Sequence, residues 1–142
     1  SQPLVGNFLD EQIYKGILDN YFLATRSARQ LNLSAHGNSS PSNLILQNGE
    51  KSLNDLISGI DDGFFVTEML GMSFNAVNGD YSRGAAGFKI DKGELSYPVS
   101  EVTIAGNMVD MLQNLTPAKD LEINDNINSP SILIENMTLA GL

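Results

Sequence analysis

His36 is the first residue to consider as a catalytic group, because it is the only histidine of the chain. It lies in residues 34–40, a segment of small and polar residues. An imidazole can serve as a general base or a metal ligand, but a catalytic zinc usually takes three protein ligands, commonly more than one His or a Cys. With no cysteine and no second histidine, the chain cannot build such a site in that way alone. We therefore interpret His36 as a surface or loop-packing residue.

Two further side chains could take part in hydrolysis. Glu68 follows an apolar stretch and could act as a general base, but a catalytic carboxylate needs a partner acid or a metal to define its role. We expect Glu68 to form a structural salt bridge instead. Ser73 follows Gly71 and Met72 in a pattern that superficially suggests a nucleophile, but no histidine lies near it in the sequence. Nucleotide-binding loops and the G-x-S-x-G motif are also absent from the sequence, so no catalytic residue is predicted.

The segment 78–88 carries the densest group of unusual residues. Its four residues from Gly84 to Gly87 are all glycine or alanine, which allows another backbone to come very close. One interpretation is an edge that docks a peptide or partner, where an Arg side chain grips a carboxylate or carbonyl. The favoured interpretation is a tight hairpin whose charged residues satisfy local backbone groups. The candidate docking residues are Asp80, Ser82, Arg83, Ala85 and Ala86.

Three dipeptides that end in glycine predict the turns that would position these residues. They are Asn48 with Gly49, Asn78 with Gly79, and Lys92 with Gly93. Each pair is typical of a tight hairpin, in which the central residues adopt positive φ. The flanking segments predicted as strands are 44–46, 64–67, 74–77, 87–90 and 95–99. The apolar phase slips after Ser100, which predicts a bulge, and Pro98 is expected at an edge or a break.

The remaining elements are short. Ser52 and Asp55 resemble a capping box that begins a helix ending near Gly59. Asn107 caps a second predicted helix, which Pro117 ends, and its methionine-rich stripe is assigned to core packing rather than to partner binding. Other predicted elements are a strand over 17–25, a helical turn over 27–30, and a pair of strands over 131–134 and 137–139. The sequence thus predicts one α+β domain, a predominantly antiparallel β-sheet (barrel-like or sandwich) with two or three short helices.

Charge and composition narrow the classes of partner. Seventeen acidic residues against eight basic ones give a formal net charge of −9, which repels phosphate backbones, so no direct nucleic-acid binding is predicted. No apolar run approaches the ~20 residues that span a bilayer, and no signal peptide is recognisable, so no membrane partner is expected. The absence of cysteine is compatible with a cytoplasmic location.

Taken together, these segments resemble the PmbA branch of the PmbA/TldD family. The stretches that carry the resemblance are 24–31, 65–71, 79–88, 93–107 and 137–141. The resemblance implies that residues 1–142 are the C-terminal domain of a family member whose N-terminal domain is absent here. It also implies that a TldD-type subunit binds zinc, through an upstream His-Glu-x-x-x-His helix and a Cys near the position of Ser129 and Pro130. Because this chain has no Cys, it resembles the metal-free PmbA type, with no cofactor of its own.

The resemblance implies two possible functions. In the first, the chain is a non-catalytic subunit domain of a cytoplasmic TldD–PmbA metallopeptidase. Its partner would be a TldD-type subunit or another copy, and its substrates would be peptides or unfolded proteins, as in microcin maturation and antitoxin degradation. In the second, the chain is a non-proteolytic interaction protein that modulates DNA gyrase or a toxin–antitoxin system by binding.

Overall fold

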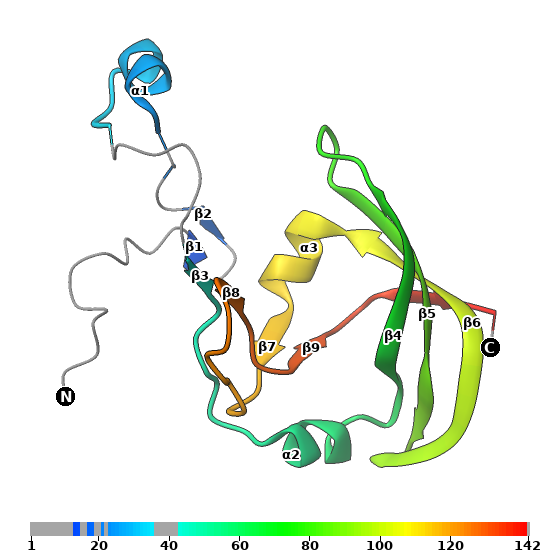
Figure 1. Ribbon diagram of the computed structural model, residues 1–142. Helices are drawn as coiled ribbons and strands as arrows, with labels where there is room; N and C mark the ends of the chain where they lie inside the picture. Colours follow the sequence, from blue (N-terminus) through cyan, green and yellow to red (C-terminus); the bar gives the residue numbers. More distant parts are fainter. Residues whose placement is uncertain (1–12, 15–16, 19–20, 22, 36–42, 142) are drawn as a thin grey trace.

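A curved four-stranded antiparallel sheet forms the main part of the domain (Figure 1). The computed structural model describes residues 13–14, 17–18, 21, 23–35 and 43–141. The sheet has the order β10–β6–β5–β4, where the strands are β4 (Asp62–Phe74), β5 (Asp80–Asp91), β6 (Glu94–Asn107) and β10 (Thr138–Ala140). The two outer strands do not pair, so the sheet is not closed into a barrel. The predicted α+β class with mainly antiparallel strands is confirmed.

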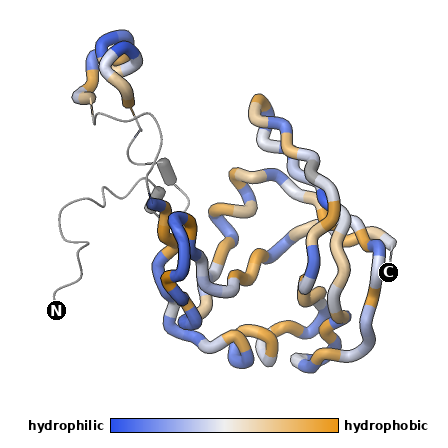
Figure 2. Tube along the Cα trace, viewed as in Figure 1, coloured by the Kyte–Doolittle hydropathy of each residue, from blue (hydrophilic) through white to orange (hydrophobic). Residues whose placement is uncertain are grey.

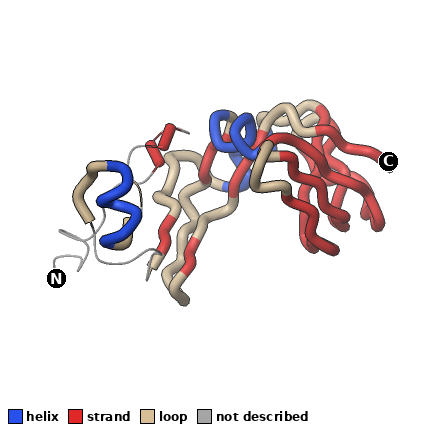
Figure 3. The backbone as a smooth tube through the Cα atoms, turned by 90° about the horizontal axis from the view of Figure 1, so that it is seen from above, coloured by secondary structure: helices blue, strands red, loops and turns tan. Residues whose placement is uncertain are grey.

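Short helices and paired segments complete the described part. The helices are α1 (Thr25–Leu31), α2 (Leu53–Ser58) and α3 (Met108–Gln113). Antiparallel pairs join β1 (Ile13–Tyr14) to β2 (Ile17–Leu18) and β7 (Leu115–Pro117) to β9 (Ile132–Ile134), while β3 (Leu44–Ile45) pairs in parallel with β8 (Ile127–Asn128). Figure 3 shows the strands of the large sheet gathered at one end of the molecule. Within the described residues, no helix combines the length and apolarity that crossing a bilayer requires.

Two of the three predicted turns connect strands of the large sheet. Lys92 and Gly93 alone link β5 to β6, with φ of 51° and 82°, as a tight two-residue hairpin demands. Between β4 and β5 the connection is longer, and only Gly79 has positive φ, at 80°. The prediction of a hairpin at Gly49 is wrong: its N–H donates to the carbonyl of Ala118 at 2.8 Å, and β3 pairs with the distant strand β8.

Gly79 should resist substitution by a β-branched residue, because its left-handed backbone disfavours side chains and a Cβ there would lie 3.1 Å from Asn107 Oδ1. We expect Gly79→Val to lower the free energy of unfolding by about 1–3 kcal/mol. The matched control is Ala76→Val in the same turn, where φ is not positive and the expected change is within about 0.5 kcal/mol. Chemical denaturation checks both values, and equal stability of the two variants would show that the left-handed turn does not constrain residue 79.

Bulges in β4 and β6 bend the sheet. Val99 of β6 pairs with Gly87 of β5, and Val102 pairs with Ala85. β6 therefore carries one extra residue there, and Glu101 has φ of 64°. This confirms the bulge predicted after Ser100. Pro98 lies in the half of β6 that β10 does not cover, as predicted for a residue without an N–H. The predicted strand 64–67 lies within β4, which carries two register shifts of its own. The predicted strand 74–77 is wrong beyond Phe74, where β4 ends and the turn to β5 begins.

Both capped helices form where the sequence predicts. Ser52 Oγ accepts from Asp55 N at 3.1 Å, and the Asp55 carboxylate accepts from Ser52 N at 3.1 Å, which completes the capping box of α2. Asn107 Oδ1 accepts from Val109 N at 3.1 Å and caps α3. The predicted end of this helix at Pro117 is wrong, because residues 115–117 leave the helix to pair with β9. Strand pairing with distant residues therefore ends this helix before the point that the spacing of its apolar residues predicts.

Two other predictions about local structure need correction. Among the described residues of the segment predicted as a strand over 17–25, only Ile17–Leu18 is strand, and α1 begins at Thr25. The helical turn predicted at 27–30 is confirmed as part of α1. The segments 132–134 and 138–140 are strands, but they do not pair with each other, since β9 joins β7 and β10 joins β6.

Candidate functional site

The candidate docking residues all lie on β5, which is an interior strand. Its backbone is paired with β4 on one side and with β6 on the other. A peptide therefore cannot add to β5 as a new strand. The backbone of this segment is not a free edge, contrary to the docking interpretation. The glycine–alanine run instead allows the neighbouring strands to approach, since a Cβ at Gly87 would lie 1.9 Å from Phe65 O.

Asp80 and Arg83 are both held by local contacts. The Asp80 carboxylate accepts from Asn78 Nδ2 at 2.7 Å, close to Asn107, whose Nδ2 donates to Asn78 O at 2.8 Å. Arg83 Nε donates to the carbonyl of Gly71 at 2.8 Å, across the bulge in β4. These contacts match the favoured interpretation, in which the charged residues satisfy the hairpin itself.

The five docking candidates do not form one surface. β5 has no extra residue at any of its register shifts, so its side chains alternate between the two faces of the sheet. Ala85 is 0% exposed and packs in the core with Val102 and Ile104, while Ala86 lies on the opposite face and is partly exposed. A role of Ser82 or Arg83 in docking stays a prediction, whereas the buried side chain of Ala85 is inaccessible in this structure.

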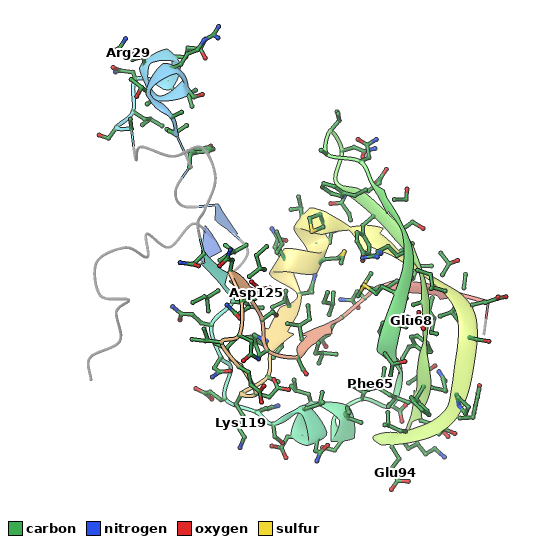
Figure 4. All side chains as sticks on the ribbon, in the orientation of Figure 1. Arg29, Phe65, Glu68, Glu94, Lys119 and Asp125 are labelled. Atoms are coloured by element: carbon green, nitrogen blue, oxygen red, sulfur yellow. The ribbon has the colours of Figure 1, made fainter. Side chains whose placement is uncertain are left out.

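The other candidate catalytic residues do not form a common site in the described part of the chain. Glu68 lies on the exposed part of β4, and no described residue forms an ion pair with it, so the expected salt bridge is not seen there (Figure 4). Ser73 is also exposed and pairs with Ser82 across the strands. His36 lies outside the described residues. Sequence reasoning thus yields no catalytic group in the described part.

The residues present do not fit a zinc site. No group of three or more His, Cys, Asp or Glu side chains converges within the described part of the chain. The sequence as a whole contains no thiolate donor, and its one imidazole cannot supply the several nitrogen ligands that catalytic zinc commonly takes. No chemical step is therefore assigned to a metal held by this domain.

A large hollow, partly open and lined by both apolar and polar residues, is the feature that the sequence did not predict. It has a volume of about 1160 Å³ and lies between α2, α3, the segment around β9 and the large sheet. Figure 2 shows hydrophobic colour along these elements. The side chains that line it include Leu56, Phe65, Thr67, Met108 and Ile132. They come from segments far apart in the sequence, so periodicity within any single segment could not reveal the hollow.

Asp120 anchors the chain that leads to one wall of this hollow. Its carboxylate accepts from Ser131 N at 2.8 Å and from Ser131 Oγ at 2.7 Å, next to β9. The hydrogen bond from the Ser131 hydroxyl, followed by that from its N–H, lowers the pKa of Asp120. Both bonds stabilise the charged form.

This contact should make stability depend on pH. A carboxyl whose pKa is lower in the folded state stabilises the fold above its unfolded pKa of about 4, and this contribution is lost as pH falls through the folded pKa. We expect Asp120→Asn to be less stable than the parent at pH 7, with the difference shrinking below about pH 4. Urea denaturation across this range measures it. The matched variant Ser131→Ala removes the hydroxyl donor of this contact and should reduce the same pH dependence.

Comparison with known proteins agrees with this architecture. Residues 10–141 match the profile of the PmbA/TldA metallopeptidase C-terminal domain. Metalloprotease PmbA of Escherichia coli O157:H7 is 41% identical over 131 residues, which cover 91% of this chain and 29% of that protein. A TldD metalloprotease homologue of Buchnera aphidicola subsp. Acyrthosiphon pisum is 21% identical in an alignment 156 positions long, gaps included, that covers 91% of this chain and 32% of that protein.

A solved structure shares the fold. The protein from Bacteroides thetaiotaomicron, named as a candidate modulator of DNA gyrase, superposes with a TM-score of 0.79 at 33% identity, over 88% of this chain and 29% of that chain. This chain thus spans about three tenths of the length of the relatives that it matches. It belongs to the PmbA/TldD metallopeptidase family, and its residues 10–141 correspond to the C-terminal domain of that family.

Proposed function

We propose that this domain belongs to a PmbA-type, metal-free subunit of a cytoplasmic metallopeptidase that acts on peptides or unfolded proteins. The observation that carries the proposal is its closer similarity to a PmbA protein than to a TldD homologue, 41% against 21% identity. The donor set supports it, because a chain without cysteine and with one histidine is poorly suited to hold a catalytic zinc. The zinc of the assembly would then be held by a TldD-type partner.

In this assembly the domain would help to shape the peptide chamber and contact the partner. The surface near the β4–β5 hairpin supports that role, because Asp80 is exposed and Arg83 and Ser82 are only partly buried. Arg83 uses its Nε on Gly71, and the two terminal nitrogens of a guanidinium carry further donors suited to a carboxylate or carbonyl.

The test is reconstitution of the complete polypeptide with and without a TldD-type subunit. Alone, it should hold no stoichiometric zinc after dialysis, by elemental analysis, and should not cleave an unfolded peptide. Together, the two chains should co-purify, bind zinc and cleave the peptide, and a chelator should abolish cleavage. Arg83→Ala should weaken co-purification or peptide binding, with Lys92→Ala at the opposite hairpin as the control. One tightly held zinc per chain in the isolated protein would contradict the proposal.

A second candidate function is a non-proteolytic protein that modulates gyrase or a toxin–antitoxin system by binding. It is favoured by the name of the solved relative from Bacteroides thetaiotaomicron. The net charge of −9 favours contact with protein rather than with DNA. Co-purification with gyrase subunits, together with no peptidase activity when a TldD-type subunit is added, would select this function over the first.

A further inference from the structure

The chain contains two Asn–Gly dipeptides, Asn48–Gly49 and Asn78–Gly79, which can undergo a covalent reaction that needs only water. The glycine backbone nitrogen attacks Cγ of the asparagine side chain, and the bond from Cγ to Nδ2 breaks. The side-chain nitrogen leaves as ammonia, taking the proton of the glycine N–H, and a cyclic succinimide remains. Water then opens the ring to aspartate or isoaspartate, without oxidation or reduction. Glycine favours this reaction because it has no Cβ to obstruct ring closure.

Asn48–Gly49 is held by contacts to a distant segment of the chain. Asn48 Oδ1 accepts from Leu121 N at 2.9 Å, and Gly49 N donates to Ala118 O at 2.8 Å. A Cβ at Gly49 would lie 1.9 Å from Pro117 O, so the two backbones are in close contact. The pairing of β3 with β8 before this dipeptide and the helix α2 after it restrain the segment further. Ring closure at Asn48 therefore requires segments 73 residues apart in the sequence to separate.

Asn78–Gly79 lies instead in the exposed turn between β4 and β5, which projects at the top of Figure 1. Asn78 Oδ1 accepts from Asp80 N at 3.1 Å, and Gly79 N donates to Asn75 O at 2.8 Å. Both partners belong to the turn itself. Opening the turn therefore frees the two groups that react without moving any distant segment.

Two hydrogen bonds tether this turn to the start of α3. Asn107 Nδ2 donates to Asn78 O at 2.8 Å, and Met108 N donates to Gly79 O at 2.7 Å. Both lie at the end of the β5–β6 ladder, whose last pair is Asp80 with Asn107. The ends of paired strands open at a lower free-energy cost than segments that are restrained on both sides. We propose that Asn78 is a site of spontaneous deamidation, which opening of this strand end makes possible, and that Asn48 is protected by its distant contacts. The inference is independent of the proposed function, because the reaction needs only water.

Deamidation of Asn78 changes the contacts of the turn. Asn78 Nδ2 donates to Asp80 Oδ2 at 2.7 Å, and the product replaces this donor with a carboxylate, so two like charges face each other. Isoaspartate also routes the backbone through Cβ and Cγ, so the carbonyl that accepts from Asn107 no longer belongs to the main chain. The reaction therefore weakens the tether of the turn, beside Ser82 and Arg83 on the same strand.

The relative exposure of the two asparagines to this reaction tests the proposal. The complete polypeptide is incubated in mildly alkaline buffer, folded and in urea, and peptide mapping by mass spectrometry follows amide-to-acid conversion at Asn78 and Asn48. Labelling by an isoaspartyl methyltransferase detects the isoaspartate product. We expect the native rate, divided by the rate in urea, to be at least about tenfold higher at Asn78, which equals ~1.4 kcal/mol in opening free energy. A smaller difference, or no conversion of Asn78 in the native chain, would overturn the proposal.

Asn107→Ser tests the role of the tether. Serine can still cap α3, but it lacks the amide donor to Asn78 O. We expect conversion at Asn78 to become about fivefold faster, the effect of losing one hydrogen bond, while Asn48 keeps its parental rate. An unchanged rate at Asn78 would contradict opening of this strand end as the step that permits the reaction. If Asn107→Ser does not fold, the comparison of the two asparagines in the parent decides the proposal.

Discussion

Gly87→Ala is expected to cost about 3 kcal/mol of unfolding free energy, the upper end for an overpacked interior. A Cβ at this position would lie 1.9 Å from Phe65 O and 2.9 Å from the Phe65 carbonyl carbon. Both are backbone atoms of the paired strand β4, so no side-chain rotation can relieve the clash, and the two strands must separate. Thermal unfolding should show a midpoint lowered by roughly 6–12 °C.

Gly106→Ala is the matched control for this prediction. Gly106 also lies within a strand and its φ is not positive, but the nearest atoms to a Cβ there are in the flexible side chains of Met111 and Met137, at 3.5 Å. We expect its stability to change by less than about 1 kcal/mol. Similar losses in both variants would mean that the close approach of β4 and β5 is not what constrains position 87.

The second large effect is expected at the neighbouring alanine. Ala85 is 0% exposed and lies against Val102 and Ile104, so Ala85→Phe must displace the core and should lower the unfolding free energy by about 1–3 kcal/mol. Ala86 lies on the other face and is partly exposed, so Ala86→Phe should cost less than about 1 kcal/mol. Urea titration of the two variants measures the difference.

The same two variants distinguish a role in core packing from a role in docking a partner. Binding to a TldD-type subunit or a peptide should survive Ala86→Phe if that face is free, and should fall without loss of stability if the face is a contact surface. Equal destabilisation by both substitutions would contradict the assignment of Ala85 and Ala86 to opposite faces of β5.

Sequence motifs correctly predicted those elements whose structure depends on residues close together in the sequence. The Ser52 capping box, the Lys92–Gly93 hairpin and the bulge beside Glu101 each depend on residues within a few positions, and each appears in the structure. The class of the fold followed from these signals together with strand alternation.

Predictions failed where distant pairing decides the outcome. The second helix ends early because residues 115–117 pair with β9, and Gly49 lies beside Pro117 rather than in a hairpin. By contrast, the opposite orientation of Ala85 and Ala86 could be predicted, because consecutive side chains of a strand alternate between faces, and the structure buries Ala85 and leaves Ala86 partly exposed. The hollow depends on the tertiary arrangement of several elements, and its lining could not be recognised before they were placed.

The order of the strands has a consequence for how this domain assembles. Strands β4, β5 and β6 follow one another in the chain and are joined by short turns, so their pairing closes only small loops. β10 must instead return from the C-terminal end of the chain, and β3 must find β8 about eighty residues away. Because the entropy lost on closing a loop increases with its length, the central meander can form first and serve as a template for the later strands. Backbone amides of β5, enclosed from that early stage on both sides, should then exchange with solvent more slowly than those of β8.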